Sequence, residues 1–433
     1  MQQEHLKREI GVWGLSANII NIIVGAGIFV LPAIVAEGLG AAGVLAYLFC
    51  GLLVALIMFC FAEVGSKITI SGGVYAYTEV AFGKYAGFLT TWLFLYACIT
   101  ADAAVVNALA DVLGSVIPAF KIQVVRILFF FVVFAGLAYV NVAGVKQGIG
   151  LVKFNTIAKL TPLLLLVLIG LTQISGSNLQ WEGMSPLSSF GEVSLVLFFA
   201  FQGAESALTV GGEVRNPHRT IPKSIFLGVG GILLLYILIQ TTAQGVLGAS
   251  LATAKDAPLA EAAKVIFGPV GFTFMIVGAA ISMFGYLSGE ILSIPRVAYR
   301  ASLDNVIPIK VLSRIHPKYA TPFIAIIIYA AMDFLLASAG GFKQLAIASS
   351  AAILLIYLGV ALSAIKLRKK SEENAGFKTP GGYLIPVAAI LTIVWLLSNL
   401  TRKELVVVTA FIAGISVFFL IMRRIHLIKN NNS

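Results

Sequence analysis

Long apolar runs dominate the chain, and short polar segments separate them. A helix needs about 20 apolar residues to cross the hydrocarbon core of a membrane. Twelve runs meet this need, near residues 11–37, 40–66, 85–117, 123–142, 151–174, 189–210, 224–248, 265–300, 322–338, 343–366, 384–400 and 405–424. The runs do not alternate between apolar and polar residues, as the strands of a membrane β-barrel would. The pattern therefore predicts an all-α integral membrane protein with 12 transmembrane helices.

The composition agrees with this prediction. Hydrophobic residues make up 59% of the 433 residues, charged residues make up only 11%, and the mean hydropathy is +0.98. A soluble domain carries about 25% charged residues, so these charges cannot cover a water-facing surface. A soluble enzyme, a soluble nucleic-acid-binding protein and a disordered chain are excluded.

The net charge of +11 reflects where lysine and arginine lie. Twelve spans place both termini on one side, and the loops on that side carry roughly three times as many lysines and arginines as the others, which is typical of cytoplasmic loops. We therefore expect both termini in the cytoplasm and no binding to nucleic acid. The polar segments are short, so residues 1–433 are expected to form a single transmembrane domain.

Two of the apolar runs are interrupted at their middle. The first contains Gly-Ala-Gly at residues 25–27, and the sixth contains Gln-Gly-Ala-Glu at residues 202–205. Glycine costs about 1 kcal/mol in a helix interior and lets the backbone approach a ligand. For either run alone, close packing between helices is an equally good explanation.

The two interruptions occupy matching places. Runs one and six each open a set of five spans, and the two sets have opposite orientations, a pattern typical of secondary transporters. We therefore predict a LeuT-like 5+5 inverted repeat with broken helices 1 and 6. Residues 1–175 form the first repeat in this prediction, residues 189–366 the second, and residues 384–424 two accessory helices.

Broken helices leave backbone groups unpaired in the membrane, which is costly unless a ligand pairs with them. The amides of Gly25, Ala26 and Gly27 lie at the N-terminus of a half-helix, which favours a carboxylate. Freed carbonyls near residues 199–202 favour an ammonium group. The two interruptions together predict a binding site for an α-amino acid.

Three segments carry a resemblance to a known family: VGAGIFVLPA at residues 24–33, SGGVYAYTEVAFGKYAGF at 71–88, and AFQGAESALTVGGEVRNPHRTIP at 200–222. Over nearly its whole length the chain resembles the amino acid–polyamine–organocation (APC) superfamily. The sequence GAESA within the third segment is most similar to that of the bacterial basic amino acid and polyamine antiporters. The resemblance implies a permease of a bacterial-type cytoplasmic (inner) membrane that works by alternating access, as a proton-coupled symporter or an amino acid exchanger.

The resemblance also implies roles for single residues. The substrate carboxylate would bind the amides of Ala26 and Gly27, and its ammonium the carbonyls of Ile23, Phe199 and Gln202.

Two aromatic residues match the gates of such transporters. Phe199 would close over the substrate, and Tyr286 would line the lower gate. The arginine/agmatine exchanger has tryptophan at both positions, and tryptophan binds cations better than phenylalanine or tyrosine. This departure weakens the case for arginine as substrate.

Five ionisable residues lie well inside the predicted spans, where charge is costly and is a sign of function or of mutual pairing. They are Asp102, Lys159, Glu205, Glu290 and Asp333. The family carries an acid at Glu205, which implies that this residue senses protons or couples the gate. Glu290 lies one turn after Tyr286 and lines the pathway or pairs with a basic neighbour, and Asp333 is expected to be structural.

Lys159 and Asp102 bear on coupling and on the substrate. Several amino acid permeases have a lysine where sodium-coupled relatives bind a cation, and Lys159 matches it, which argues against sodium coupling; snorkelling toward the cytoplasm is the alternative. Exchanger-type relatives have asparagine at the position of Asp102, near the end of the substrate side chain. Asp102 pairs with a cationic substrate, pairs with a protein cation, or stays protonated.

Two other functions stay open: a sodium-coupled solute symporter of the same fold, and a non-transporting nutrient sensor. No redox, phosphate or metal motif is present in the sequence, so we expect no cofactor and no enzymatic activity. The expected partners are an amino acid, protons and the lipid bilayer.

Overall fold

The computed structural model of the chain describes residues 10–68, 74–144, 149–181, 183, 185–204, 214–370, 377–379 and 381–431. Their regular elements are helices, and an isolated parallel β-bridge joins Ile10 to Val214. Within these residues, eight helical segments are long and apolar enough to cross a membrane, and four shorter apolar helices accompany them. The prediction of an all-α protein with several membrane spans is confirmed, whereas the total of twelve spans stays a prediction.

The described residues of the first half form seven α-helices, with short 3₁₀ segments between some of them. The first predicted span is divided between the first two of them, and a short helix precedes the long fifth one. They are α1 (Val12–Ile23), α2 (Gly27–Leu39), α3 (Val44–Lys67), α4 (Val74–Phe82), α5 (Lys84–Gly114), α6 (Gln123–Val142) and α7 (Ile149–Gly170).

The described residues of the second half form eight α-helices and several short 3₁₀ segments. Two of these segments matter below, η5 (Phe198–Phe201) and η8 (Lys310–Ser313). The α-helices are α8 (Leu187–Leu197), α9 (Pro217–Leu247), α10 (Pro258–Phe267), α11 (Pro269–Leu303), α12 (Phe323–Ala339), α13 (Phe342–Lys370), α14 (Leu384–Leu397) and α15 (Arg402–Asn431).

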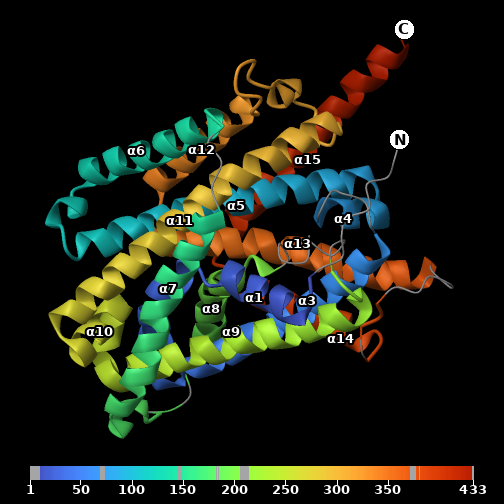
Figure 1. Ribbon diagram of the computed structural model, residues 1–433. Coiled ribbons are helices and arrows are strands. Elements are labelled where there is room, and N and C mark those ends of the chain that lie inside the picture. Colours follow the sequence, from blue (N-terminus) through green and yellow to red (C-terminus); the bar gives the residue numbers. More distant parts are fainter. Residues whose placement is uncertain are drawn as a thin grey trace.

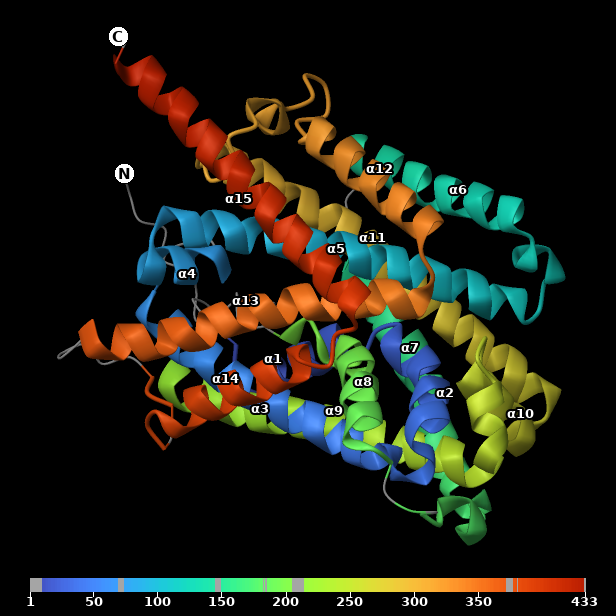
Figure 2. The same cartoon turned by 180° about the vertical axis from the view of Figure 1, so that it is seen from behind.

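The helices pack in two groups with a long helix between them. The helices α5, α6, α11 and α12 lie together on one side, and α6 runs beside α12 (Figures 1 and 2). On the other side, α9 packs against α1 and α3, and α8 packs against α2 and α3. Between the groups, α13 contacts both α5 and α3. The two halves of the broken first span therefore belong to one group, and α5 and α11 to the other.

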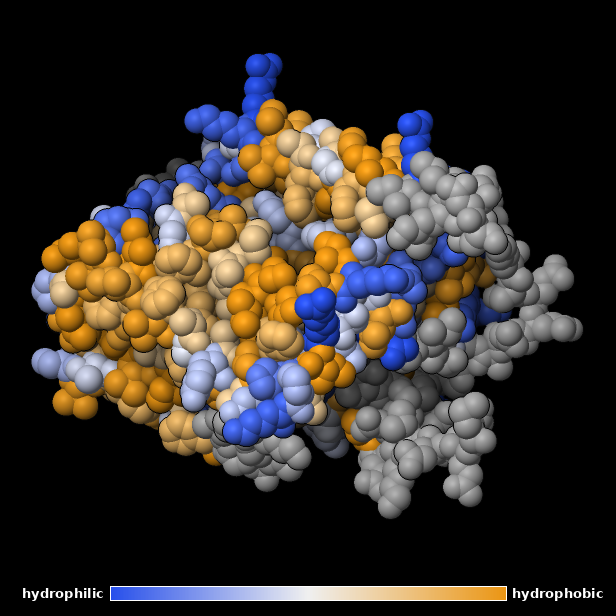
Figure 3. Space-filling model, turned by 90° about the horizontal axis from the view of Figure 1, so that it is seen from above, coloured by the Kyte–Doolittle hydropathy of each residue, from blue (hydrophilic) through white to orange (hydrophobic). Residues whose placement is uncertain are grey.

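Much of the outer surface is apolar. Large hydrophobic side chains are exposed along α6, α14 and α15, among them Val132, Leu391 and Val406. Hydrophobic residues form wide continuous areas on the face shown in Figure 3. Soluble monomers rarely expose such large apolar areas, and a surface of this kind fits helices that face lipid.

Candidate functional site

The first predicted span is broken where the sequence predicts. Helix α1 ends at Ile23, Val24 adopts an extended conformation, and α2 begins at Gly27. No side chain caps the N-terminus of α2. The Phe29 amide donates to the Ala26 carbonyl oxygen at 3.1 Å, whereas the Gly27 amide at the start of the helix has no acceptor within the helix. Gly27 is therefore the first residue of the second half-helix rather than part of the open segment.

The sixth predicted span also loses its α-helical form at mid-length. After Leu197, α8 tightens into η5, and Gln202 is extended. Gly203 follows with φ +96°, a conformation that glycine adopts readily and other residues rarely do. The break is confirmed for the described residues up to 204. Glu205, the predicted coupling residue, lies outside the described residues.

The two breaks lie against each other. A β-carbon added to Gly27 would come within 2.8 Å of the Ala200 Cα, so only glycine allows the two backbones to lie this close. The Tyr236 hydroxyl on α9 lies 3.2 Å from the Ile23 carbonyl oxygen and 3.1 Å from that of Ala200. Tyr236 is fully buried. It thus joins the last turn of α1 to η5.

The resemblance assigns the Ile23 carbonyl oxygen to the substrate ammonium, and the Tyr236 hydroxyl lies within hydrogen-bonding distance of the same oxygen. A carbonyl oxygen has two lone pairs, so the contact with Tyr236 leaves one for a substrate ammonium. The sequence analysis missed Tyr236. The available signal was a hydroxyl in the middle of the seventh apolar run, GILLLYILIQ at residues 231–240.

Lys159 lies beside the first break. Its Nζ donates to the Asn21 carbonyl oxygen at 2.6 Å, and the side chain is buried in the protein. The Thr156 hydroxyl, one turn earlier on α7, donates to Asn21 Oδ1 at 2.8 Å. The ammonium group is therefore directed at the end of α1 and does not extend toward water, as a snorkelling lysine would.

The side chain of Gln202 bridges the second break to α13. Gln202 Nε2 donates to Ser350 Oγ at 2.9 Å. The Ser349 hydroxyl lies 3.0 Å from Gln202 Oε1 and 2.9 Å from the Ala97 carbonyl oxygen on α5. Ser349 and Ser350 were not singled out in the sequence. They connect the broken span to the helix that crosses between the two groups.

Phe199 and Tyr286 belong to different elements and have different neighbours. The Phe199 ring in η5 packs edge-on against Phe342 of α13, with 5.7 Å between ring centroids. Tyr286 is on α11, where it interacts electrostatically with Asp102 and Glu290. The two predicted gate residues are thus not in contact with each other through the interactions described here.

Asp102 is fully buried between α5, α11 and α12. Its Oδ2 accepts a hydrogen bond from the Tyr329 hydroxyl at 2.9 Å. Glu290 and Asp333 also interact with it electrostatically. The contacts of Asp102 therefore lie on α11 and α12, whereas those of the two breaks lie on α7, α9 and α13.

The structure contains a further buried charge that the sequence analysis did not include. Glu63 on α3 is fully buried and forms ion pairs with Arg368 and with Lys67, the latter at 3.2 Å. The Thr379 amide donates to Glu63 Oε2 at 3.1 Å. The apolar run FCFAEVG at residues 59–65 was the available signal. Glu63 joins α3, α13 and the segment that precedes α14.

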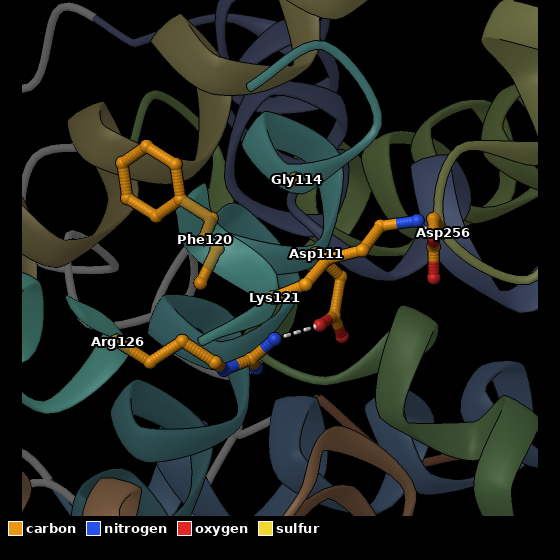
Figure 4. A pocket seen from close by; sticks show the side chains of 7 residues that line it. Asp111, Gly114, Phe120, Lys121, Arg126 and Asp256 are labelled. Atoms are coloured by element: carbon orange, nitrogen blue, oxygen red, sulfur yellow. Dashed lines mark hydrogen bonds and ion pairs between the residues drawn. The ribbon is translucent and has the colours of Figure 1, made fainter. Parts of the chain in front are cut away.

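A polar cavity of about 280 Å³ lies at the end of α5. Figure 4 shows Arg126 reaching to Asp111 and Lys121 reaching toward Asp256. Gly114 and Phe120 complete its lining together with Ala110. None of the predicted substrate-binding residues lines this cavity, so it is separate from the two breaks.

Broken apolar helices packed around a central crossing helix define a multi-pass membrane transport protein of the permease class. The family model for amino acid permeases matches residues 10–425. The chain therefore belongs to the amino acid permease family, as the resemblance to the APC superfamily implied. Permeases are transporters rather than enzymes.

Curated relatives are similar over most of the chain. The serine/threonine exchanger SteT of Bacillus subtilis (strain 168) is 28% identical, over 89% of this chain and 89% of its own. The branched-chain amino acid permease BcaP of the same organism is 25% identical, over 98% and 94%. The large neutral amino acids transporter small subunit 2 of Oryctolagus cuniculus is 27% identical, over 74% of this chain and 62% of its own.

Proposed function

We propose that this chain is a secondary active transporter that moves amino acids across the cytoplasmic membrane by alternating access. It works as a proton-coupled symporter or as an amino acid exchanger. Both termini are cytoplasmic in this proposal. Residues 1–175 and 189–366 are the inverted repeats, and residues 384–424 are accessory helices.

The contact between Lys159 and Asn21 carries this proposal. The ammonium lies 2.6 Å from a carbonyl oxygen at the end of α1, three residues before Val24 opens the break. A fixed ammonium supplies there the positive charge that a bound sodium ion would otherwise supply. Transport therefore needs no sodium, and the alternative of a sodium-coupled symporter is disfavoured.

The substrate backbone binds at the two breaks. Its carboxylate accepts hydrogen bonds from the amides of Gly25, Ala26 and Gly27, at the uncapped N-terminus of α2. Its ammonium donates to the carbonyls of Ile23, Phe199 and Gln202. Because these groups belong to the backbone, they recognise any α-amino acid and leave the choice of side chain to other residues.

Two aromatic residues close the site, and two ionisable residues couple it. Phe199 covers the substrate, and Tyr286 lines the pathway toward the cytoplasm. Lys159 and Glu205 exchange the protons that accompany transport. Asp102 contacts the substrate side chain in this proposal only in the case of a cationic substrate, with which it would pair.

The names of the relatives favour a neutral substrate. One is named for serine and threonine, one for branched-chain amino acids and one for large neutral amino acids. In addition, Phe199 and Tyr286 bind a cation less strongly than the tryptophans of the arginine exchanger would. We therefore propose neutral amino acids as substrates, ahead of arginine and the polyamines.

Purified protein in liposomes tests this proposal. Uptake of labelled serine, leucine and arginine is measured without sodium, with an inward proton gradient into empty vesicles and separately into vesicles loaded with unlabelled amino acid. Gradient-driven uptake into empty vesicles identifies a symporter, and uptake only into loaded vesicles identifies an exchanger. A strict requirement for sodium contradicts the proposal, and binding without uptake under any condition identifies a sensor.

A variant of Lys159 tests the residue that carries the proposal. Lys159→Ala removes a charge-assisted hydrogen bond, and we expect uptake to fall by about tenfold or more. Lys343→Ala is the matched control, because that lysine is half-exposed and pairs with an equally exposed Glu192. Sodium-independent uptake by Lys159→Ala at the wild-type rate contradicts the role of Lys159.

A further inference from the structure

Three carboxyl groups on three helices lie together in the second helix group. Asp102 on α5, Glu290 on α11 and Asp333 on α12 interact electrostatically with one another. Asp102 and Asp333 are both fully buried, at 0% exposure. We call these three residues the carboxyl cluster. The helices that carry it pack against each other, and all three lie together in Figure 1.

The two aspartates have more acceptor atoms than the described residues can satisfy. Tyr329 donates to Asp102 Oδ2 at 2.9 Å and Tyr286 also acts as a hydrogen-bond donor to this carboxyl group, but Asp102 Oδ1 has no hydrogen bond of normal geometry among the described residues. Neither oxygen of Asp333 has one. A buried acceptor without a donor costs about 1–3 kcal/mol, and more if it is charged. Asp333 therefore requires a ligand that the side chains around it do not provide.

Glu63 shows what a satisfied buried carboxylate looks like in this chain. It is as buried as the two aspartates, yet Arg368, Lys67 and Thr379 surround it. No lysine or arginine of the described residues is among the groups that act on Asp102 or Asp333. Asp102 and Asp333 thus lack the neighbouring cations that offset the cost of burying a carboxylate.

The titratable neighbours of the carboxyl cluster are a thiol and two phenols: Cys98 on α5, Tyr286 on α11 and Tyr329 on α12. The basic side chains that the structure describes on the helices packed against α5, α11 and α12 have contacts elsewhere or are exposed. Four of them form ion pairs: Arg126 with Asp111, Lys264 with Glu261, Lys343 with Glu192, and Arg368 with Glu63. Lys159 donates a hydrogen bond to Asn21, and Lys366 lies over the Phe82 ring. Lys310 is exposed.

The three carboxyl groups of the cluster do not converge on one metal ion. Among the described residues, no three histidine, cysteine, aspartate or glutamate side chains converge closely enough to hold one ion. A proton needs only one carboxyl oxygen and one neighbouring acceptor, and two carboxyl groups close together readily share one. We propose that the carboxyl cluster is a proton-binding site, in which Asp333 carries a proton taken up from water and Asp102 stabilises it.

This site differs from Lys159 in its position. Lys159 contacts α1 beside the first break, whereas the carboxyl cluster lies in the helix group that contains neither break. Tyr286 connects the carboxyl cluster to the proposed transport pathway, because it belongs to the proposed gate and interacts with all three carboxyl groups. The coupling role of the site rests on the proposed transport function, but proton binding itself does not.

Infrared difference spectroscopy of the protein in lipid tests proton binding directly. A protonated carboxyl group has a C=O stretching band that a carboxylate lacks. We expect the wild type to show this band near neutral pH and to lose it in alkaline buffer. In Asp333→Asn, which keeps the shape of the side chain, the band should lose about half of its area or more, since two coupled groups share the proton.

Controls separate this site from other carboxyl groups and other ions. Glu192→Gln removes a carboxylate that is already paired with Lys343, so the band should be unchanged. Tyr329→Phe removes one of the donors to Asp102, and should keep the band but change the pH at which it disappears. No band in the folded wild type, an unchanged band in Asp333→Asn, or loss of the band on adding sodium at constant pH overturns the proposal.

Transport provides a second readout. In vesicles, Asp333→Asn should lose the stimulation of uptake by a proton gradient while exchange between loaded vesicles and medium continues. Full stimulation in this variant contradicts the coupling role. If the wild type transports no amino acid at all, the proposed function fails, but the infrared band still decides whether the carboxyl cluster binds a proton.

Discussion

Gly27 and Ala200 lie in direct backbone contact, although 172 residues separate them in the sequence. A β-carbon on Gly27 would be 2.8 Å from the Ala200 Cα and 2.9 Å from its Cβ. The contact joins the start of α2 to η5. The two breaks in the helices are therefore one structural unit. The atoms that leave no room for a side chain at position 27 belong to the second break and not to α2.

Gly27→Ala should separate the two breaks. The added methyl group meets backbone atoms that cannot rotate away, and such overpacking costs about 1–3 kcal/mol. We expect a lower melting temperature in detergent and strongly reduced amino acid uptake. Gly136→Ala on α6 is the control, because a β-carbon there meets nothing within 4 Å. Equal uptake by the two variants would contradict the role of the close contact.

Tyr236→Phe should loosen the same unit without adding volume. It removes a hydroxyl that lies within hydrogen-bonding distance of the Ile23 and Ala200 carbonyl oxygens. Leaving buried acceptors without this donor costs about 1–3 kcal/mol. We expect a lower melting temperature and a lower maximal rate of uptake. Tyr139→Phe on the exposed face of α6 should change neither, and the proposed unit is wrong if the two variants behave alike.

The sequence predicted the class of fold and the position of the breaks because both follow from local patterns. Length and hydropathy define a membrane helix, and Gly-Ala-Gly at residues 25–27 interrupts one. The boundary of the first break differs from the prediction. The structure assigns Gly27 to α2 rather than to the open segment, and the residue packs there against the Ala200 backbone.

The partners of the breaks could not be read from the sequence. Tyr236 and Ser349 reach the breaks from helices whose register depends on packing across the whole molecule. Likewise, Asp333 looked structural because a single acid in an apolar run gives no sign of its neighbours. Only the fold brings it to Asp102, 231 residues away in the sequence.

Glu63→Gln should destabilise the protein more than any exposed charge would. The substitution leaves Arg368 and Lys67 without their buried carboxylate. Removing one member of a buried ion pair costs about 3–5 kcal/mol, and we expect a marked fall in the melting temperature. Glu192→Gln, which breaks a half-exposed pair with Lys343, should leave the melting temperature nearly unchanged. Similar melting temperatures for the two variants would show that the buried pair adds little.

Ser349→Ala tests whether the bridge from Gln202 to α13 and α5 supports substrate binding. The variant removes the hydroxyl near Gln202 Oε1 and the Ala97 carbonyl oxygen, so the Gln202 side chain is held by Ser350 alone. Because the proposed ammonium site includes the Gln202 carbonyl, we expect the KM for the amino acid to rise by about fivefold to tenfold, which corresponds to one lost hydrogen bond.

The same helix offers a matched control. Ser363 is also fully buried on α13, but its hydroxyl donates only to the Gly359 carbonyl oxygen at 2.8 Å, within its own helix. Ser363→Ala therefore removes a buried hydroxyl of the same kind without touching the breaks, and its KM should equal that of the wild type. A rise in KM in both variants would mean that α13 responds to any lost hydroxyl. A rise in Ser349→Ala alone assigns the effect to Gln202 and links the position of the second break to the affinity for the amino acid.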